Sequence, residues 1–112
     1  MPVTEPRYAA VIHAPNRLQI CAMLAAVDSM EFSRVRESLG VSDSVLSKHL
    51  KVLEGAGYVE VTKARGASYP RTWIALTRDG RRALAGHIAE LRRIVAFADA
   101  PSGGEGETPP SD

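Results

Sequence analysis

Apolar residues recur with a helical period over residues 41–58, and this pattern is the clearest in the chain. Spacings of four and three place three leucines in one stripe along a helix. The stripe consists of Leu46, Leu50 and Leu53. Ser42 is suited to cap the N-terminus of this helix, because its hydroxyl can accept a hydrogen bond from a first-turn amide. Gly55 and Gly57 are expected to end it, so the pattern predicts a helix over about residues 42–56.

The opposite side of this predicted helix has short hydroxyl groups and positive charges. Its residues are Ser44, Ser47, Lys48 and Lys51. Asp43 precedes them in the first turn, where a carboxylate suits the positive end of the helix dipole. Surfaces of this kind bind the phosphates and base edges of DNA. A solvated surface helix has the same composition, so the neighbouring segments decide between the two interpretations.

The residues before this helix predict two further helices and a tight turn. Apolar positions at helical spacing favour a helix over residues 17–27, and residues 30–32 are expected to form one extended bridge. Ser33 is suited to cap a short helix over residues 33–39, which Gly40 ends. Only one residue then separates Gly40 from the cap of the next helix. Two helices joined this closely indicate a helix-turn-helix motif.

Two strand-like segments follow the helix-turn-helix motif. Residues 59–63 and 71–76 alternate apolar and polar side chains, as half-buried strands do. The basic segment between them contains Gly66 for a bend and Pro70, which strands accept at an end or an edge. The pattern predicts a β-hairpin over residues 59–76, and a hairpin in this position is a wing.

The last predicted helix, residues 78–98, has a narrow apolar seam, and Thr77 is expected to cap it. The seam has steps of four, three and four and consists of Leu84, Ile88, Leu91 and Val95. Such a seam packs either on the core of its own domain or on a second copy of the helix. We favour the second copy, because the helix extends beyond what a domain of this size covers.

Length and composition complete the fold prediction. The chain has 112 residues, of which 45% are hydrophobic, and this suits one domain. We expect a flexible arm over residues 1–7, a short helical turn between residues 6 and 13, and a domain over residues 8–98. Residues 99–112 are expected to be a disordered acidic tail, because they have too little apolar surface to offset the cost of ordering. The predicted fold class is mainly α with a small β-hairpin, a winged helix-turn-helix with a long C-terminal dimerisation helix.

Positive charge is concentrated in the middle of the chain, although the formal net charge is only +1. Residues 33–82 contain ten Lys or Arg and five Asp or Glu, so this segment has a charge of +5 and the remainder has −4. A basic middle segment is the electrostatic footprint expected of a DNA-binding domain. As much as half of this charge is also compatible with ordinary solvated surface.

The composition disfavours several kinds of site and location. Cys21 is the only cysteine, so no disulfide forms within the chain, and we expect a cytoplasmic protein. We expect Cys21 to be a small core residue, with a redox-sensing thiol as the alternative. No apolar run approaches the roughly 20 residues that cross a bilayer, and the N-terminus lacks the hydrophobic stretch of a signal peptide.

No pattern in the chain indicates an enzyme or a metal site. There is no phosphate-binding loop and no G-x-S-x-G motif. His13 and His87 have no Cys or carboxylate at metal-ligand spacing, so we expect neither a metal nor another cofactor. His49 is expected to pack beside the leucine stripe and to form a hydrogen bond.

Three stretches of the sequence resemble MarR/ArsR-like stand-alone winged helix-turn-helix transcriptional regulators. The opening helix of that family is similar to HAPNRLQICAMLAA at residues 13–26. The recognition helix and first wing strand are similar to VSDSVLSKHLKVLEGAGYVEV at residues 41–61. The second wing strand and the turn into the last helix are similar to YPRTWIALTRDGRRAL at residues 69–84. Together the resemblance covers about residues 8–98.

The resemblance implies DNA contacts for particular side chains. In the predicted recognition helix the groove contacts are Ser42, Asp43, Ser44, Ser47 and Lys48. The implied phosphate contact is Lys51, and the implied wing contacts are Lys63, Arg65 and Arg71. Members of the family are typically homodimers that pair through their terminal helices and bind roughly palindromic sites. Metal-sensing ArsR-type relatives have a cysteine pair or a His/Asp set, and the single cysteine here argues against that kind of sensing.

The residues themselves support the same mechanism, because a two-fold dimer presents two recognition helices to successive major grooves. The candidates for base edges are Ser44, Ser47 and Lys48. Asp43 either accepts from a cytosine amino group or caps the helix, and we favour the cap. Arg65 at the wing tip either contacts the minor groove or its phosphates, or is a solvated loop residue.

The sequence therefore predicts a homodimeric regulator that binds specific sites in double-stranded DNA. Its recognition helix is residues 42–56 and its wing is residues 59–76. Because a dimer on a promoter most simply excludes polymerase, we expect a repressor, and activation remains open. Two alternatives also remain open: a winged-helix protein-interaction module, and a regulator that senses a small-molecule effector in the core or at the dimer seam.

Overall fold

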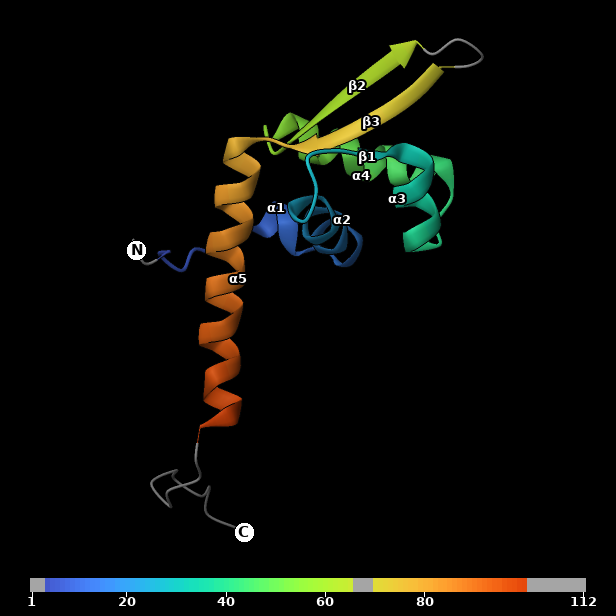
Figure 1. The fold of residues 1–112 in the computed structure, drawn as a ribbon. Helices are drawn as coiled ribbons and strands as arrows, with labels where there is room; N and C mark the ends of the chain where they lie inside the picture. Colours follow the sequence, from blue (N-terminus) through green and yellow to red (C-terminus); the bar gives the residue numbers. More distant parts are fainter. Residues whose placement is uncertain (1–3, 66–69, 101–112) are drawn as a thin grey trace.

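The computed structural model describes residues 4–65 and 70–100 of the chain. Its elements follow in the order α1 (Ala10–His13), α2 (Pro15–Ala25), β1 (Met30–Glu31), α3 (Phe32–Leu39), α4 (Asp43–Gly55), β2 (Val59–Arg65), β3 (Pro70–Leu76) and α5 (Arg78–Asp99). The strands form one antiparallel sheet in the order β1-β3-β2. Figure 1 shows the β2–β3 hairpin projecting to the upper right and the lower half of α5 projecting downward, away from the other helices. The predicted fold class, a mainly helical winged helix-turn-helix, is confirmed.

Helices α3 and α4 form the helix-turn-helix motif. The predicted caps on either side of the turn between them are present, whereas the predicted cap at the N-terminus of α3 is not. Gly40 ends α3 in the left-handed conformation with φ of 68°, and the Ser42 hydroxyl accepts a hydrogen bond from the Val45 amide at 3.2 Å. Helix α3, however, begins directly after β1 and has Glu31 as its N-cap. The prediction that Ser33 caps α3 is therefore wrong, because Ser33 is already inside the helix. Its hydroxyl instead donates to the Glu31 carboxylate at 3.2 Å.

The wing is a continuous antiparallel pair of strands. Its register begins with Val59 opposite Leu76 at the base. Pro70 is the first residue of β3, a position that tolerates the missing amide donor. The predicted bridge at residues 30–32 is the two-residue strand β1, which pairs with β3 and so joins the helix-turn-helix motif to the wing. The predicted tip, residues 66–69, lies outside the described residues.

One hydrophobic core joins the helices to the sheet. Its fully buried side chains include Ile12, Ile20, Cys21, Leu24, Val35, Leu46, Leu53 and Ile74. Burial raises the pKa of the Cys21 thiol to about 11 despite the nearby Arg17, so the thiol stays protonated and unreactive near neutral pH. The prediction that Cys21 is a core residue is confirmed.

A close contact fixes the start of α5 against the turn between α4 and β2. The Thr77 hydroxyl caps α5 by accepting from the Gly80 amide at 2.9 Å, as predicted, and donates to the Gly57 carbonyl at 2.6 Å. The Thr77 amide donates to the Tyr58 carbonyl at 3.0 Å. Gly80 lies so close to that carbonyl that a Cβ at this position would be 2.1 Å from its oxygen. The helix can occupy this place only because Gly80 has no side chain.

The segment before α1 lies across α5. The Arg7 amide donates to the Gly86 carbonyl at 2.9 Å. A Cβ at Gly86 would lie 3.3 Å from the Glu5 carbonyl oxygen, so this crossing is also close. The predicted flexible arm, residues 1–7, is described only from Thr4 onward, and its described part packs against α5.

Two histidines connect the N-terminal segment, α1 and α5. Buried His87 accepts a hydrogen bond from the Ala9 amide at Nδ1 over 3.0 Å, and its Nε2 lies 3.0 Å from Nδ1 of His13. Because Nδ1 is an acceptor, neutral His87 has its proton on Nε2 and donates it to His13. The Tyr8 ring packs on both imidazoles, with centroids 5.0 Å from each. Burial and the neighbouring His13 lower the pKa of His87, against an opposite effect of Glu90.

We expect the free energy of unfolding to decrease as the pH falls below about 6.5, the ordinary pKa of histidine. The unfolded chain then binds a proton at His87, whereas the folded chain holds this side chain neutral, so protons favour unfolding. The contribution of His87 is complete above that pH and is lost as the pH falls through the lowered pKa of the folded state. Urea unfolding at about pH 8 and about pH 5.5 measures this loss. The loss is expected to be smaller in His87→Gln, and an equal loss in both proteins would contradict the prediction.

We expect Gly80→Ala to destabilise the fold by about 1–3 kcal/mol, the usual cost of forcing extra volume into a packed site. The added methyl group would lie on the Tyr58 carbonyl, and both are backbone-anchored groups that cannot move aside easily. Gly55→Ala is the matched control, because nothing lies within 4 Å of a Cβ at Gly55 and alanine is the better helix former. Thermal and urea unfolding should show a loss in the first variant only.

Candidate nucleic-acid interface

Helix α4 buries its leucine stripe and exposes the polar and basic residues that the sequence predicted for its other side. The exposed residues are Ser44, Ser47, Lys48 and Lys51. A groove of about 570 Å³ lies between α4 and the wing. Ser47 and Lys51 of α4 line it together with Lys63 and Thr72 of the wing. The fold thus brings residues predicted to contact DNA from two separate elements into one surface.

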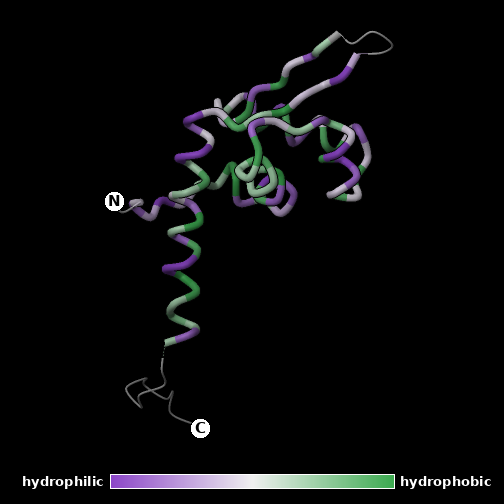
Figure 2. The backbone as a smooth tube through the Cα atoms, in the orientation of Figure 1, coloured by the Kyte–Doolittle hydropathy of each residue, from purple (hydrophilic) through white to green (hydrophobic). Residues whose placement is uncertain are grey.

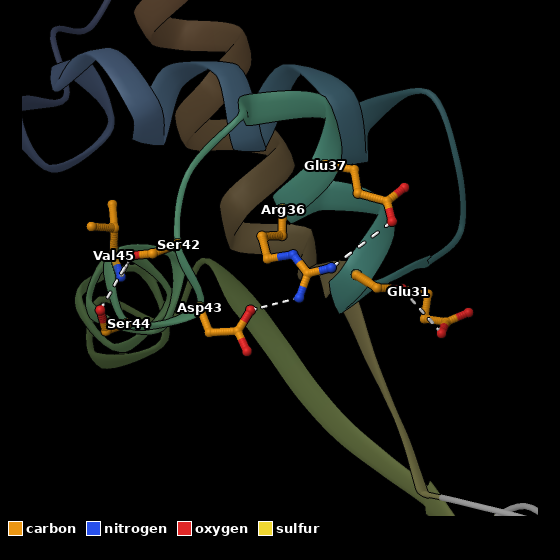
Figure 3. A network of polar contacts seen from close by, with 8 residues as sticks. Glu31, Arg36, Glu37, Ser42, Asp43, Ser44 and Val45 are labelled. Carbon is orange, nitrogen blue, oxygen red and sulfur yellow. Dashed lines mark hydrogen bonds and ion pairs between the residues drawn. The ribbon is translucent and has the colours of Figure 1, made fainter.

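Three of the predicted groove contacts, Ser42, Asp43 and Ser44, form hydrogen bonds within the chain, as Figure 3 shows. The Asp43 carboxylate accepts a hydrogen bond from Nη1 of Arg36 at 2.7 Å, and this bond raises the pKa of Arg36. Ser42 caps α4 through the Val45 amide, and its Oγ lies 3.2 Å from Oγ of Ser44. For Asp43 the sequence favoured a cap over a base contact. Its partner is instead the guanidinium group of Arg36 on α3. This ion pair links α3 to α4.

His49 of α4 makes polar contacts with two residues of α2. Its Nε2 lies 3.3 Å from Nδ2 of Asn16, and its Nδ1 lies 3.5 Å from Nη1 of Arg17. Burial and the positive charge of Arg17 lower the pKa of His49, which favours the neutral ring. The predicted packing and hydrogen-bonding role of His49 is confirmed.

The wing presents basic residues from both of its strands. Lys63 of β2 is paired with Thr72, and Arg71 of β3 is paired with Ala64 at the next position. Lys63 and Arg71 are both exposed. Arg65 is the last residue of β2, and its side chain lies outside the part of the chain that the structure describes.

Part of the positive charge of the middle segment holds the fold together. Arg36 is bonded to Asp43, as described above. Arg81 donates to the carbonyl groups of Ala25 and Val27 at 3.1 and 2.9 Å, at the end of α2. These two arginines therefore bond within the chain, whereas Lys48 and Lys51 of α4 and Lys63 and Arg71 of the wing are exposed.

Sequence reasoning missed two apolar residues on the exposed side of α4. Val45 and Val52 are 37% and 42% exposed. The signal in the sequence was their identity, because valine forms helices less readily than leucine or lysine and neither residue belongs to the leucine stripe.

The outer half of α5 exposes an apolar surface. Figure 2 shows hydrophobic stretches continuing along this half, where α5 runs clear of the other helices. Val95 is 53% exposed, and Ile88 and Leu91 are half-buried beside a groove of about 740 Å³. Ile94 and Phe97, which the predicted seam did not include, are 45% and 74% exposed.

Leu84 does not belong to this exposed surface. Its side chain is only 4% exposed and is part of the core of the chain. The prediction that Leu84 lies in a dimer interface is therefore wrong, because the first half of α5 still packs on its own domain. Most of the predicted acidic tail, residues 101–112, lies outside the described residues.

Within the described ranges, no three His, Cys, Asp or Glu side chains form a group that could hold a metal ion. In the same residues no helix has the length and apolar character needed to cross a membrane.

Comparisons with known proteins agree with this geometry. The sequence matches the winged helix DNA-binding domain family over residues 16–95. The uncharacterised protein MJ0432 of Methanocaldococcus jannaschii is 35% identical over 84 residues, which are 75% of this chain and 91% of that protein. A transcriptional regulator homologue from Pyrococcus horikoshii has a similar structure, with a TM-score of 0.76 and 26% identity over 81% of this chain and 90% of its own.

A transcriptional regulator of the MarR family from Enterococcus faecalis also has this fold. The TM-score is 0.67 and the identity is 23%, over 80% of this chain and 81% of that one. Both structural neighbours are described as transcriptional regulators or homologues of them. The chain belongs to the winged helix DNA-binding domain family and has the fold of winged-helix transcriptional regulators.

Proposed function

We propose that this winged-helix regulator is a homodimer that binds a roughly palindromic site in double-stranded DNA and represses transcription by occupying a promoter. The observation that supports the dimer is the apolar outer half of α5, on which Ile94, Val95 and Phe97 are exposed. Burial of apolar surface contributes about 25 cal/mol per Å². A second copy of the same helix offers a surface of matching length and composition.

The exposed face of α4 fits the major groove in size and chemistry. The groove is about 12 Å wide and admits a helix. We assign base contacts to Ser44, Ser47 and Lys48, and phosphate contacts to Lys51 and to the wing cations Lys63, Arg65 and Arg71. Ser42 and Asp43 act in this proposal by holding the N-terminus of α4 in place. Two such helices in a two-fold dimer contact half-sites about one turn of DNA apart.

Repression follows from occupancy in the simplest arrangement. A dimer bound over a promoter excludes polymerase without a further domain. Selection of random duplex DNA with the purified protein, followed by sequencing, tests specificity directly. An enriched inverted repeat supports the proposal, and no binding even at low salt contradicts it and directs attention to a protein partner for α5.

On the selected operator we expect Lys51→Ala to weaken binding at every sequence and to flatten the salt dependence. The variant dimer loses two phosphate-binding cations, one from each protomer, so the slope of log K against log salt should change by about 1.8. Arg7→Ala is the matched control, because it removes an exposed cation from the N-terminal segment, which lies across α5 rather than beside α4. Fluorescence anisotropy at several salt concentrations measures both slopes, and equal slopes in the two variants would contradict the assignment of Lys51.

We expect Val95→Glu to convert the dimer into a monomer at micromolar concentration, because it places two charges in an apolar seam. Val95 is exposed in the single chain, so the substitution leaves the core intact. Val95→Leu keeps the seam apolar and is expected to remain dimeric. Light scattering measures the mass, circular dichroism checks the fold, and a wild-type protein that is already monomeric would contradict the dimer.

A further inference from the structure

Val45 occupies an unusual place at the start of α4. It is the third residue of the helix, and its amide donates to the Ser42 hydroxyl that caps the helix, so its backbone position is fixed. Its side chain is nevertheless 37% exposed, outside the leucine stripe. A β-branched residue lowers helix propensity. The exposed part of this side chain is an apolar surface in the first turn of the helix, where a binding partner could cover it.

The surroundings of Val45 are those of the proposed DNA-contacting face. Val45 and Lys48 are three residues apart and therefore neighbours on the helix surface. Ser44, also exposed, precedes Val45 in the first turn. Figure 3 shows the Val45 side chain directed away from Arg36 and α3. If Lys48 contacts DNA as proposed, Val45 occupies a neighbouring position on the helix surface and its methyl groups can reach the same groove.

Only one base offers an apolar group in the major groove. Thymine presents its C5 methyl, whereas the other base edges present hydrogen-bond donors and acceptors. In helix-turn-helix proteins the N-terminal residues of the recognition helix contact base edges. The hydroxyl groups of Ser44 and Ser47 can bond to several bases, so they leave the sequence undetermined. Val45 lies on the flank of α4 next to Lys48, and an apolar residue there adds a contact that only thymine among the bases can satisfy.

We propose that Val45 is a specificity-determining residue that contacts the C5 methyl of a thymine in each half-site of the operator. The proposal rests on the proposed function, because it needs α4 to lie in the major groove. Lys48 and the serines supply polar contacts at neighbouring positions, and Val45 supplies the apolar one. Replacement of this thymine by any other base removes the methyl group from the valine.

The test uses the selected operator and replaces its thymines, one position at a time, by deoxyuridine. This change removes only the methyl group and leaves the base pair intact. For the wild-type protein we expect about fourfold weaker binding at one thymine in each half-site, the equivalent of one buried methylene group. For Val45→Ala we expect weaker binding to the thymine operator and no further loss at that position with deoxyuridine.

Val52→Ala provides the matched control. Val52 is 42% exposed on the same helix but lies two turns further from the N-terminus. This variant is expected to keep the fourfold preference for thymine. Both valines are exposed and alanine is the better helix former, so both variants should fold.

The outcomes separate the two proposals. A preference for thymine that persists unchanged in Val45→Ala, or that disappears in Val52→Ala instead, overturns the role of Val45. An operator with no position sensitive to deoxyuridine also overturns it, while leaving the proposed function intact. If no sequence is enriched at all, the proposed function fails first and the role of Val45 fails with it.

Discussion

The arrangement of the DNA-contacting elements depends on the joint between the end of α4 and the start of α5. At this joint Thr77 bonds to the backbone of Gly57 and Tyr58, and Gly80 packs directly on the Tyr58 carbonyl. Three elements meet there, because Tyr58 immediately precedes the first wing strand. The missing side chain of Gly80 therefore fixes the position of the long helix relative to both the recognition helix and the wing.

The recognition helix is also held on its other sides, and this determines which polar residues remain for DNA. Asp43 is bonded to Arg36 of α3, and His49 is bonded to α2. Polar residues at the N-terminus and on the inner flank thus position α4, whereas Lys48 and Lys51 extend from it into solvent. In the proposed complex with DNA, a helix held in this way loses little conformational entropy, so more of its contact energy contributes to affinity.

The sequence predicted the features whose cause lies within a few residues. The caps at Ser42 and Thr77, the left-handed Gly40 and the alternating wing strands all depend on local backbone chemistry, and the structure has each of them. Ser33 failed as a cap because β1 runs straight into α3, and the length of β1 is set by its pairing with β3.

Features with partners far along the chain could not be predicted in the same way. The partner of Asp43 lies across a turn on α3, and the Ala9 amide that bonds to His87 is 78 residues away. Periodicity showed which side of α5 is apolar but not where the domain core ends. Leu84 was therefore assigned to a dimer interface, although its side chain packs in the core of its own chain. The exposed Val45 was overlooked because an apolar residue in a helix is first interpreted as part of its buried face.

In the proposed dimer, the apolar side of α5 contacts first its own domain and then the second copy. Gly80, Leu84, His87 and Leu91 follow one another at steps of four, three and four, so they lie on one side of the helix. The first three of these are buried against the rest of the chain, and the side chain of the fourth is half-buried at the point where that packing ends. A second copy that covers Leu91 and the residues beyond it must therefore approach from the side on which the domain itself lies. Because Gly80 and His87 hold the inner part of the helix in place, the direction of that approach, and with it the spacing between two recognition helices, is set by contacts within each chain.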